Sequence, residues 1–114
     1  MGQALDTVNK FMQSQDTALL TNEFWFSGPV DQTHGIEAFM KLNQSFFPMV
    51  TAMRMLQQFE NGNNVCSIYE VDLTPPSGKS LTLKVADWVV VSNGKMVEEH
   101  LFYDAREYAT ALGC

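Results

Sequence analysis

Two carboxylic acids, Asp87 and Glu99, lie on opposite arms of one predicted β-hairpin that spans residues 81–104. An Asn-Gly pair at 93–94 marks its turn, and this dipeptide between apolar runs is a strong hairpin signal. Strand side chains alternate between two faces, so Asp87 shares its face with aliphatic residues: Leu81, Leu83, Val85, Val89 and Val91. A carboxyl on such an apolar face is either exposed to solvent by a bend in the strand, paired with another polar group, or a catalytic group.

The hairpin register decides which residue faces Asp87. A two-residue turn pairs Asp87 with His100, whereas a three-residue turn with Gly94 in the left-handed region pairs it with Glu99. The three-residue turn gives the more apolar face, which suits a core: Val97, Glu99, Leu101 and Tyr103. We therefore predict the three-residue turn.

On that register, two carboxyls oppose each other on an apolar face. Like charges so close cannot both ionise cheaply, so the pKa of one should rise. A pair that shares a proton suits acid–base chemistry on a small carbon acid or epoxide. The alternative is a structural pair, bridged by water or held by Arg54, Tyr69 or Trp25. We take Asp87 and Glu99 as the candidate catalytic residues.

Further residues are candidates for the lining of a ligand pocket. These are Trp25, Phe39, Tyr69, Leu101, Tyr103 and His34. The tyrosine hydroxyls could donate hydrogen bonds to a ligand, although aromatic residues at such positions also serve as plain core. Asp31 and His34 fall in a loop at the expected pocket mouth, where His34 could gate or protonate a ligand or simply be exposed.

The opposite face of the hairpin is too apolar for solvent, and we interpret it as a dimer surface. It carries Trp88, Val90, His100 and Phe102.

Hydrophobic periodicity predicts helices first and strands later. Asp16 is a candidate N-cap for a short second helix, and Thr33 for a long one that Pro48 ends. The expected elements are helices at 3–13, 16–20 and 35–47, a short helix or a tail at 105–112, a strand at 23–27, a loop at 29–34, and four strands with turns at 61–63, 75–78 and 93–94. This order predicts one α+β domain over 1–114, with helices on one face of a curved antiparallel sheet.

Composition narrows the function classes. The 114 residues carry a net charge of −6 without a basic cluster, which disfavours nucleic acid and anionic membranes as partners. Cys66 and Cys114 lack metal-ligand spacing, and we expect two free thiols and no metal or cofactor. No apolar run approaches the ~20 residues that span a bilayer, and the N-terminus lacks a signal-peptide core. We expect a cytoplasmic domain.

Two segments carry a family resemblance: GPVDQTHGIEAF at 28–39 and DWVVVSNGKMVEE at 87–99. With the order of elements, they resemble the nuclear transport factor 2-like superfamily, in particular its SnoaL-like and ketosteroid-isomerase-like members. The resemblance implies a cone-shaped (cystatin-like) fold with an apolar pocket between sheet and helices. It also implies a homodimer through the outer sheet face. It does not imply one activity, because one fold hosts many functions.

The match to the catalytic residues of these families is partial. Asp87 stands where ketosteroid isomerases keep a protonated aspartic acid that binds the substrate oxyanion. Their general base would fall near 27–28, which is Ser-Gly here, and their oxyanion tyrosine near Phe11. Glu99 and Leu101 replace the histidine and aspartate of the SnoaL-like pattern. We predict a domain that binds a small apolar molecule with a polar handle, and one hypothesis is that it acts as a cofactor-free isomerase, cyclase or hydratase. The alternative is a non-catalytic ligand-binding or protein-interaction dimer.

Overall fold

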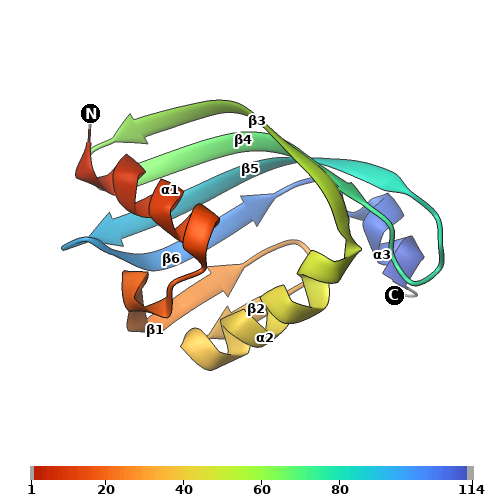
Figure 1. The fold of residues 1–114 in the computed structure, drawn as a ribbon, viewed down its shortest axis with the longest axis horizontal. Helices are drawn as coiled ribbons and strands as arrows, with labels where there is room; N and C mark the ends of the chain where they lie inside the picture. The colour runs from red at the N-terminus through yellow and green to blue at the C-terminus, as the bar shows by residue number, and fades with distance from the viewer. Residues whose placement is uncertain (1, 113–114) are drawn as a thin grey trace.

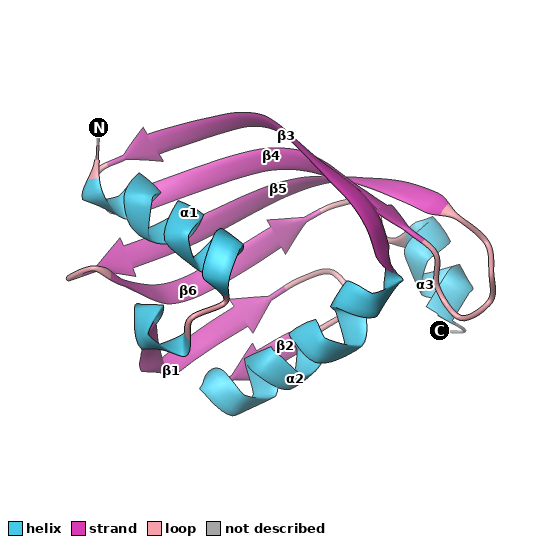
Figure 2. Cartoon of the chain, in the orientation of Figure 1, coloured by secondary structure: helices cyan, strands magenta, loops and turns pink. Residues whose placement is uncertain are grey.

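The structure, a computed structural model, describes residues 2–112 as a curved six-stranded sheet that wraps around helices (Figures 1 and 2). The helices are α1 (Gln3–Ser14), α2 (Ile36–Phe46) and α3 (Arg106–Leu112), with short 3₁₀ turns η1 (Thr17–Leu19) and η2 (Phe47–Met49). The strands are β1 (Leu20–Ser27), β2 (Gln32–His34), β3 (Val50–Asn61), β4 (Asn64–Leu73), β5 (Leu81–Ser92) and β6 (Lys95–Phe102). The predicted α+β class is confirmed.

The strands follow the order β2-β1-β6-β5-β4-β3, and the sheet is open at β2 and β3. Strands β3 to β6 form the predicted antiparallel meander. The expectation of a purely antiparallel sheet is wrong in one place, because β1 pairs with β6 in parallel. Parallel neighbours need a long crossover, and here most of the chain lies between the two strands. This pairing attaches the N-terminal half of the chain to the C-terminal hairpin.

The predicted helices form, but two details around α2 differ. The 29–34 loop contains the short strand β2, which pairs with the end of β1. Thr33 lies on β2 and does not cap α2; Gly35 takes the N-cap position with a φ of 88°, a conformation that glycine tolerates best. Asp16 caps η1 as predicted, since its Oδ1 accepts a 2.9 Å hydrogen bond from the Ala18 N–H.

The helices cover the concave face of the sheet (Figure 1). Helix α1 packs on β4, β5 and β6, and α2 packs on β1 and β2. Ala4, Val8 and Phe11 are buried one turn apart on α1, the spacing of an amphipathic helix. They join Phe24 and Phe39 in the core, where each buried phenylalanine contributes about 1.5–3 kcal/mol. No helix within 2–112 is long and apolar enough to cross a membrane.

The β5–β6 turn has two residues, so the predicted three-residue turn is wrong. Asn93 and Gly94 both have positive φ, 53° and 76°, as a type I′ turn requires, and Ser92 pairs with Lys95. The twist of this turn matches that of the two strands, which favours it over the longer loop.

A β-bulge then shifts the register by one residue. Val91 pairs with Met96 but Val90 pairs with Glu98, which leaves Val97 as the extra residue. After the bulge Asp87 pairs with Leu101. The pairing expected from either turn is therefore wrong, since Asp87 lies directly opposite neither Glu99 nor His100.

The bulge nevertheless places Glu99 on the face that carries Asp87. Glu99 pairs with Val89, so the two carboxyls are diagonal neighbours. Diagonal neighbours on one sheet face lie within reach of long side chains. The face predicted for Glu99 is correct, although the turn that led to the prediction is not.

Candidate functional site

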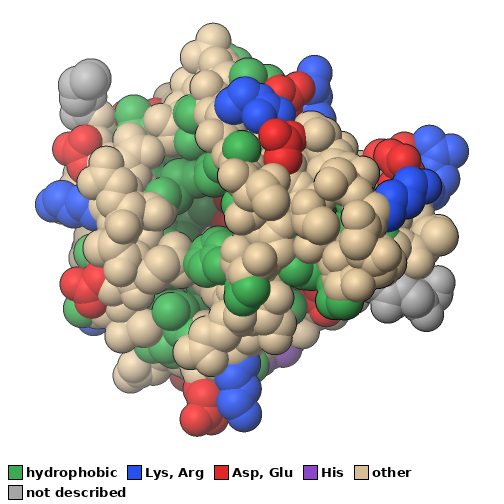
Figure 3. All heavy atoms as spheres, turned by 45° about the vertical axis from the view of Figure 1, so that its right-hand side comes forward, with side chains coloured by type: hydrophobic (Ala, Val, Ile, Leu, Met, Phe, Trp, Pro, Cys, Tyr) green, Lys and Arg blue, Asp and Glu red, His purple; other side chains and the backbone are tan. Residues whose placement is uncertain are grey.

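A cavity of about 180 Å³ lies between the helices and the concave face of the sheet. Figure 3 shows a hollow with hydrophobic walls in the surface of the protein. Apolar side chains from both layers line the cavity, among them Phe11, Phe26, Phe39, Val85 and Val89. An engineered apolar cavity of about 150 Å³ holds one benzene molecule, so this cavity accommodates a body of about one ring.

Asp87 and Glu99 lie in the sheet wall of this cavity. Their residues are only 5% and 8% exposed. Asp87 Oδ2 accepts a 3.0 Å hydrogen bond from the Tyr69 hydroxyl on β4, and Glu99 is the diagonal neighbour of Asp87 on the same face of the sheet. Three adjacent strands, β4, β5 and β6, thus each contribute one member of a buried polar cluster in an apolar wall.

Burial sets the protonation of this cluster. Removal from water raises the pKa of Glu99 well above its ordinary value, and the adjacent Asp87 raises it further. Burial also raises the pKa of Asp87, but hydrogen bonds from Glu99 and Tyr69 oppose that rise. Burial therefore favours a pair that retains one proton between Asp87 and Glu99. Carboxyl–carboxyl hydrogen bonds require such a proton.

Asp87 keeps one unused acceptor atom. Within residues 2–112, the buried Oδ1 atom accepts no hydrogen bond from a backbone group or a fixed side-chain donor. Two donors could satisfy it: the proton of Glu99, or a donor on a molecule in the cavity. Buried polar atoms normally have partners, and exceptions are common at functional sites.

The structure brings together most of the predicted pocket residues. Phe39, Tyr69, Leu101 and Tyr103 line the cavity. Burial raises the pKa of the Tyr103 hydroxyl, with smaller contributions from Tyr108 and Asp31.

Trp25 and His34 do not line the cavity, which corrects their predicted place. Phe24 and Phe26 are buried, so the alternation of β1 sends Trp25 to the opposite face. There it stacks on His34, which is exposed on β2, with 6.2 Å between ring centroids. The alternation around Trp25 was visible in the sequence and could have given the right face.

Sequence reasoning missed Tyr108 and did not define the role of Asp31. Asp31 lines the cavity from the β1–β2 loop, and Tyr108 does so from α3. Asp31 and His34 were both expected at the pocket mouth, but only Asp31 lines the cavity, whereas His34 lies with Trp25 on the opposite face. No pattern in the sequence reports that the C-terminal helix closes this end of the cavity.

The convex face carries a different cluster, centred on His100. Its Nε2 lies 2.6 Å from Glu98 Oε2, and its ring lies between Trp25 and Trp88, with centroid distances of 4.8 and 4.6 Å. His100 thus faces outward, as predicted. Cys66, on β4, is a free thiol, and Cys114 lies outside the described residues.

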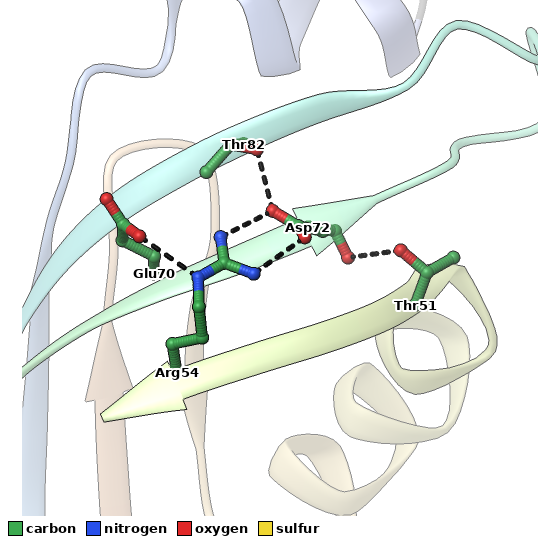
Figure 4. A network of polar contacts seen from close by, with 5 residues as sticks. All are labelled: Thr51, Arg54, Glu70, Asp72 and Thr82. Carbon is green, nitrogen blue, oxygen red and sulfur yellow. Dashed lines mark hydrogen bonds and ion pairs between the residues drawn. The ribbon is translucent and has the colours of Figure 1, made fainter. Parts of the chain in front are cut away.

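Further along the convex face, Arg54 joins two carboxylates (Figure 4). Its guanidinium contacts both oxygens of Asp72 at 2.8 and 2.9 Å and one oxygen of Glu70 at 3.1 Å. The Thr82 hydroxyl donates a further 2.7 Å hydrogen bond to Asp72. These donors hold the pKa of Asp72 below its ordinary value.

The family model of the SnoaL-like domain matches residues 5–99. The chain belongs to the SnoaL-like family. Its fold is shared by an NTF2-like protein of unknown function from Burkholderia pseudomallei, at 18% identity over 100% of both chains and a TM-score of 0.81. A candidate SnoaL-like polyketide cyclase from Jannaschia sp. CCS1 is also 18% identical, over 98% of this chain and 92% of the other, with a TM-score of 0.81.

A third structure of the same fold is TerC, crystallised with polyporic acid. It is 12% identical over 99% of this chain and 100% of the other, with a TM-score of 0.78. No match was found among curated proteins. At these identities the structures establish the fold of this SnoaL-like domain. Domains of the family often bind small molecules or act as cyclases or isomerases.

Proposed function

We propose that this SnoaL-like domain binds a small, mainly apolar molecule in the cavity and that the Asp87–Glu99 pair exchanges a proton with its polar handle. The observation that carries the proposal is a buried pair of carboxyls, neighbours on one face of the sheet, in the wall of an apolar cavity. Strongly perturbed carboxyls in a cavity are the usual mark of a functional site. TerC, with polyporic acid, is a protein of this fold that was crystallised with a small organic molecule.

The chemistry that suits the pair is proton transfer without a cofactor. The ionised member of the pair is a base and the protonated member is an acid, and burial raises the pKa of both toward neutral pH. Isomerisation, cyclisation and hydration each need one proton removed and one returned. A domain that only binds its ligand would use the same pair to orient it.

This chain lacks two of the catalytic groups of ketosteroid isomerases, so the Asp87–Glu99 pair is a better candidate for proton transfer than the reaction of those enzymes. Phe11 and Gly28 both line the cavity, but they offer neither the hydroxyl nor the carboxylate of those enzymes. Asp31 lies three residues beyond Gly28 and also lines the cavity. Proton transfer in this domain therefore centres on Asp87 and Glu99.

NMR titration of the carboxyl carbons tests this function on the wild type and on Asp87→Asn. We expect the pKa of Glu99 to lie well above the ~4.3 of a model glutamate and to fall when Asp87 is neutralised. Asp72→Asn, on the convex face, is the matched control and should leave Glu99 unchanged. Ordinary pKa values for both Asp87 and Glu99 would remove the acid–base assignment.

We also propose that the convex face forms a homodimer. Phe59, Trp88 and Phe102 are 55%, 39% and 57% exposed, and strand pairing places all three on that face. Large exposed aromatics grouped on one face mark an interaction surface. Sedimentation of the wild type should give a dimer that Phe102→Lys weakens; a monomeric wild type would contradict the proposal.

A further inference from the structure

The charged groups of the cavity wall all have the same sign. Asp31, Asp87 and Glu99 are the carboxyl-bearing residues, and no lysine, arginine or histidine of the described chain lines the cavity. An anionic ligand would therefore be buried without a counter-charge, which is strongly unfavourable. The wall disfavours ligands that carry a permanent negative charge, such as carboxylates and phosphates.

The same wall offers acceptors and aromatic faces. Asp87 Oδ1 is buried, lines the cavity with its residue, and accepts no hydrogen bond from a fixed donor of residues 2–112. The hydroxyl of Tyr69 is already committed to Asp87 Oδ2. Phenylalanine and tyrosine rings cover much of the remaining wall, and such rings attract organic cations through their π faces.

A metal ion fits these groups poorly. Among residues 2–112, no three His, Cys, Asp or Glu side chains are grouped closely enough to hold one. Asp31 therefore lies apart from the Asp87–Glu99 pair, on another part of the wall. Separated carboxyls and apolar rings suit a cation with a carbon body rather than a bare ion.

We propose that the ligand of this cavity is a small amine that binds as its ammonium form, with one N–H donated to Asp87 Oδ1. The inference rests on the proposed function, because it names the ligand class of the same cavity. An ammonium group has donors and no acceptor, so it satisfies the unused oxygen directly. The cavity volume limits the carbon body to about one ring.

The ammonium pairs with the negative charge of the carboxyl pair, and the remaining proton stays with the pair. One negative charge then faces one cation, and one carboxyl is still protonated and able to act as an acid. Because the cation needs that negative charge, benzylamine-like ligands should bind more weakly as the pH falls and the pair becomes fully protonated.

Three probes of one size and different charge test the inference: benzylamine, benzyl alcohol and benzoate. Binding is followed by the methyl NMR signals of Val85 and Leu101, which line the cavity. We expect benzylamine to bind at least tenfold more tightly than benzyl alcohol, and benzoate to leave the signals unchanged. Calorimetry at neutral and acidic pH should show weaker benzylamine binding in acid and unchanged binding of benzyl alcohol.

Two variants and a control locate the effect. Asp87→Asn should reduce benzylamine affinity to that of benzyl alcohol without weakening the alcohol, and Asp31→Asn should reduce it less. Asp72→Asn, on the other face, should change neither ligand. The methyl spectra report directly whether each variant is folded, and the Asp31→Asn variant tests charge selection without altering the buried pair.

The outcomes separate the two proposals. Benzoate binding as tightly as benzylamine, or the alcohol binding more tightly than the amine, would overturn the charge selection but leave a ligand site in place. If none of the three probes binds while the pKa of Glu99 is raised, the ligand class is wrong and the acid–base pair stands. Absence of both binding and a raised pKa would remove the proposed function as well.

Discussion

The two faces of one sheet hold carboxylates in opposite electrostatic states. On the concave face, burial raises the pKa of Asp87 and Glu99. On the convex face, hydrogen bonds from Arg54 and Thr82 lower the pKa of Asp72. Both groups involve β5, which carries Asp87 and Thr82 and pairs with the strand of Asp72. Strand alternation places them on opposite faces of the sheet.

The contrast shows that the role of a carboxylate depends on its exposure to solvent and on the charge of its partner, and not on the strand that carries it. The Asp72 network has a guanidinium that satisfies its charge in water, so it is a structural contact of modest value. The Asp87–Glu99 pair has no cation among the described residues that line its cavity. It therefore opposes folding at neutral pH, as functional groups often do.

The largest expected effect is the pH dependence of stability. Glu99 has a higher pKa folded than unfolded, so its contribution is fully present below the unfolded value of ~4.3 and is lost as pH rises through the folded value. The free energy of unfolding should fall by up to about 1.36 kcal/mol per pH unit over that range. Urea unfolding of the wild type between pH 4 and 8 measures this slope.

Neutralising Asp87 should narrow the pH range over which stability falls, because Glu99 then keeps only the part of its raised pKa that comes from burial. Asp87→Asn keeps an acceptor, adds a donor and removes the buried charge, and we expect it to stabilise the protein at neutral pH by about 0.5–2 kcal/mol. Asp72→Asn should act in the opposite pH range, because the contribution of a lowered pKa is lost as pH falls through the folded value. An unchanged pH range in Asp87→Asn would mean that the carboxyls are not coupled in the folded protein.

Tyr69→Phe should destabilise the protein, by less than the full pH effect on stability. This change removes the hydrogen bond to Asp87 Oδ2, and bonds to charged acceptors contribute about 1.5–3 kcal/mol. Since that bond lowers the pKa of Asp87, its loss should raise this pKa further. Thermal unfolding and carboxyl NMR measure the two effects. Tyr103→Phe, in the same cavity, is the control; an equal shift from both variants would assign the effect to general repacking.

The sequence was sufficient to predict that Asp87 lies on an apolar strand face, because the period-2 alternation over 81–91 is typical only of a strand. Glu99 was assigned to the correct face through the wrong turn. The bulge at Val97 restores the face that the two-residue turn would have reversed, and a bulge depends on packing rather than on a local motif. Tyr108 was missed for a similar reason, since only tertiary structure brings α3 to the cavity.

The smallest effect concerns the Arg54–Asp72 contact on the convex face. It tests whether the two faces differ because solvent reaches only one of them. Arg54→Ala removes the guanidinium, the main cause of the lowered pKa of Asp72, so this pKa should return toward 3.8. Added salt should produce part of the same change in the wild type, because exposed pairs are screened. NMR titration at low and high salt measures both.

The pKa of Glu99 should be nearly the same at both salt concentrations, because its shift arises first from burial and mobile ions do not enter the site. A Glu99 pKa as sensitive to salt as that of Asp72 would mean that solvent reaches both carboxylates. The distinction between a structural network and a desolvated pair would then fail, and the charge selectivity inferred for the cavity would lose its physical basis.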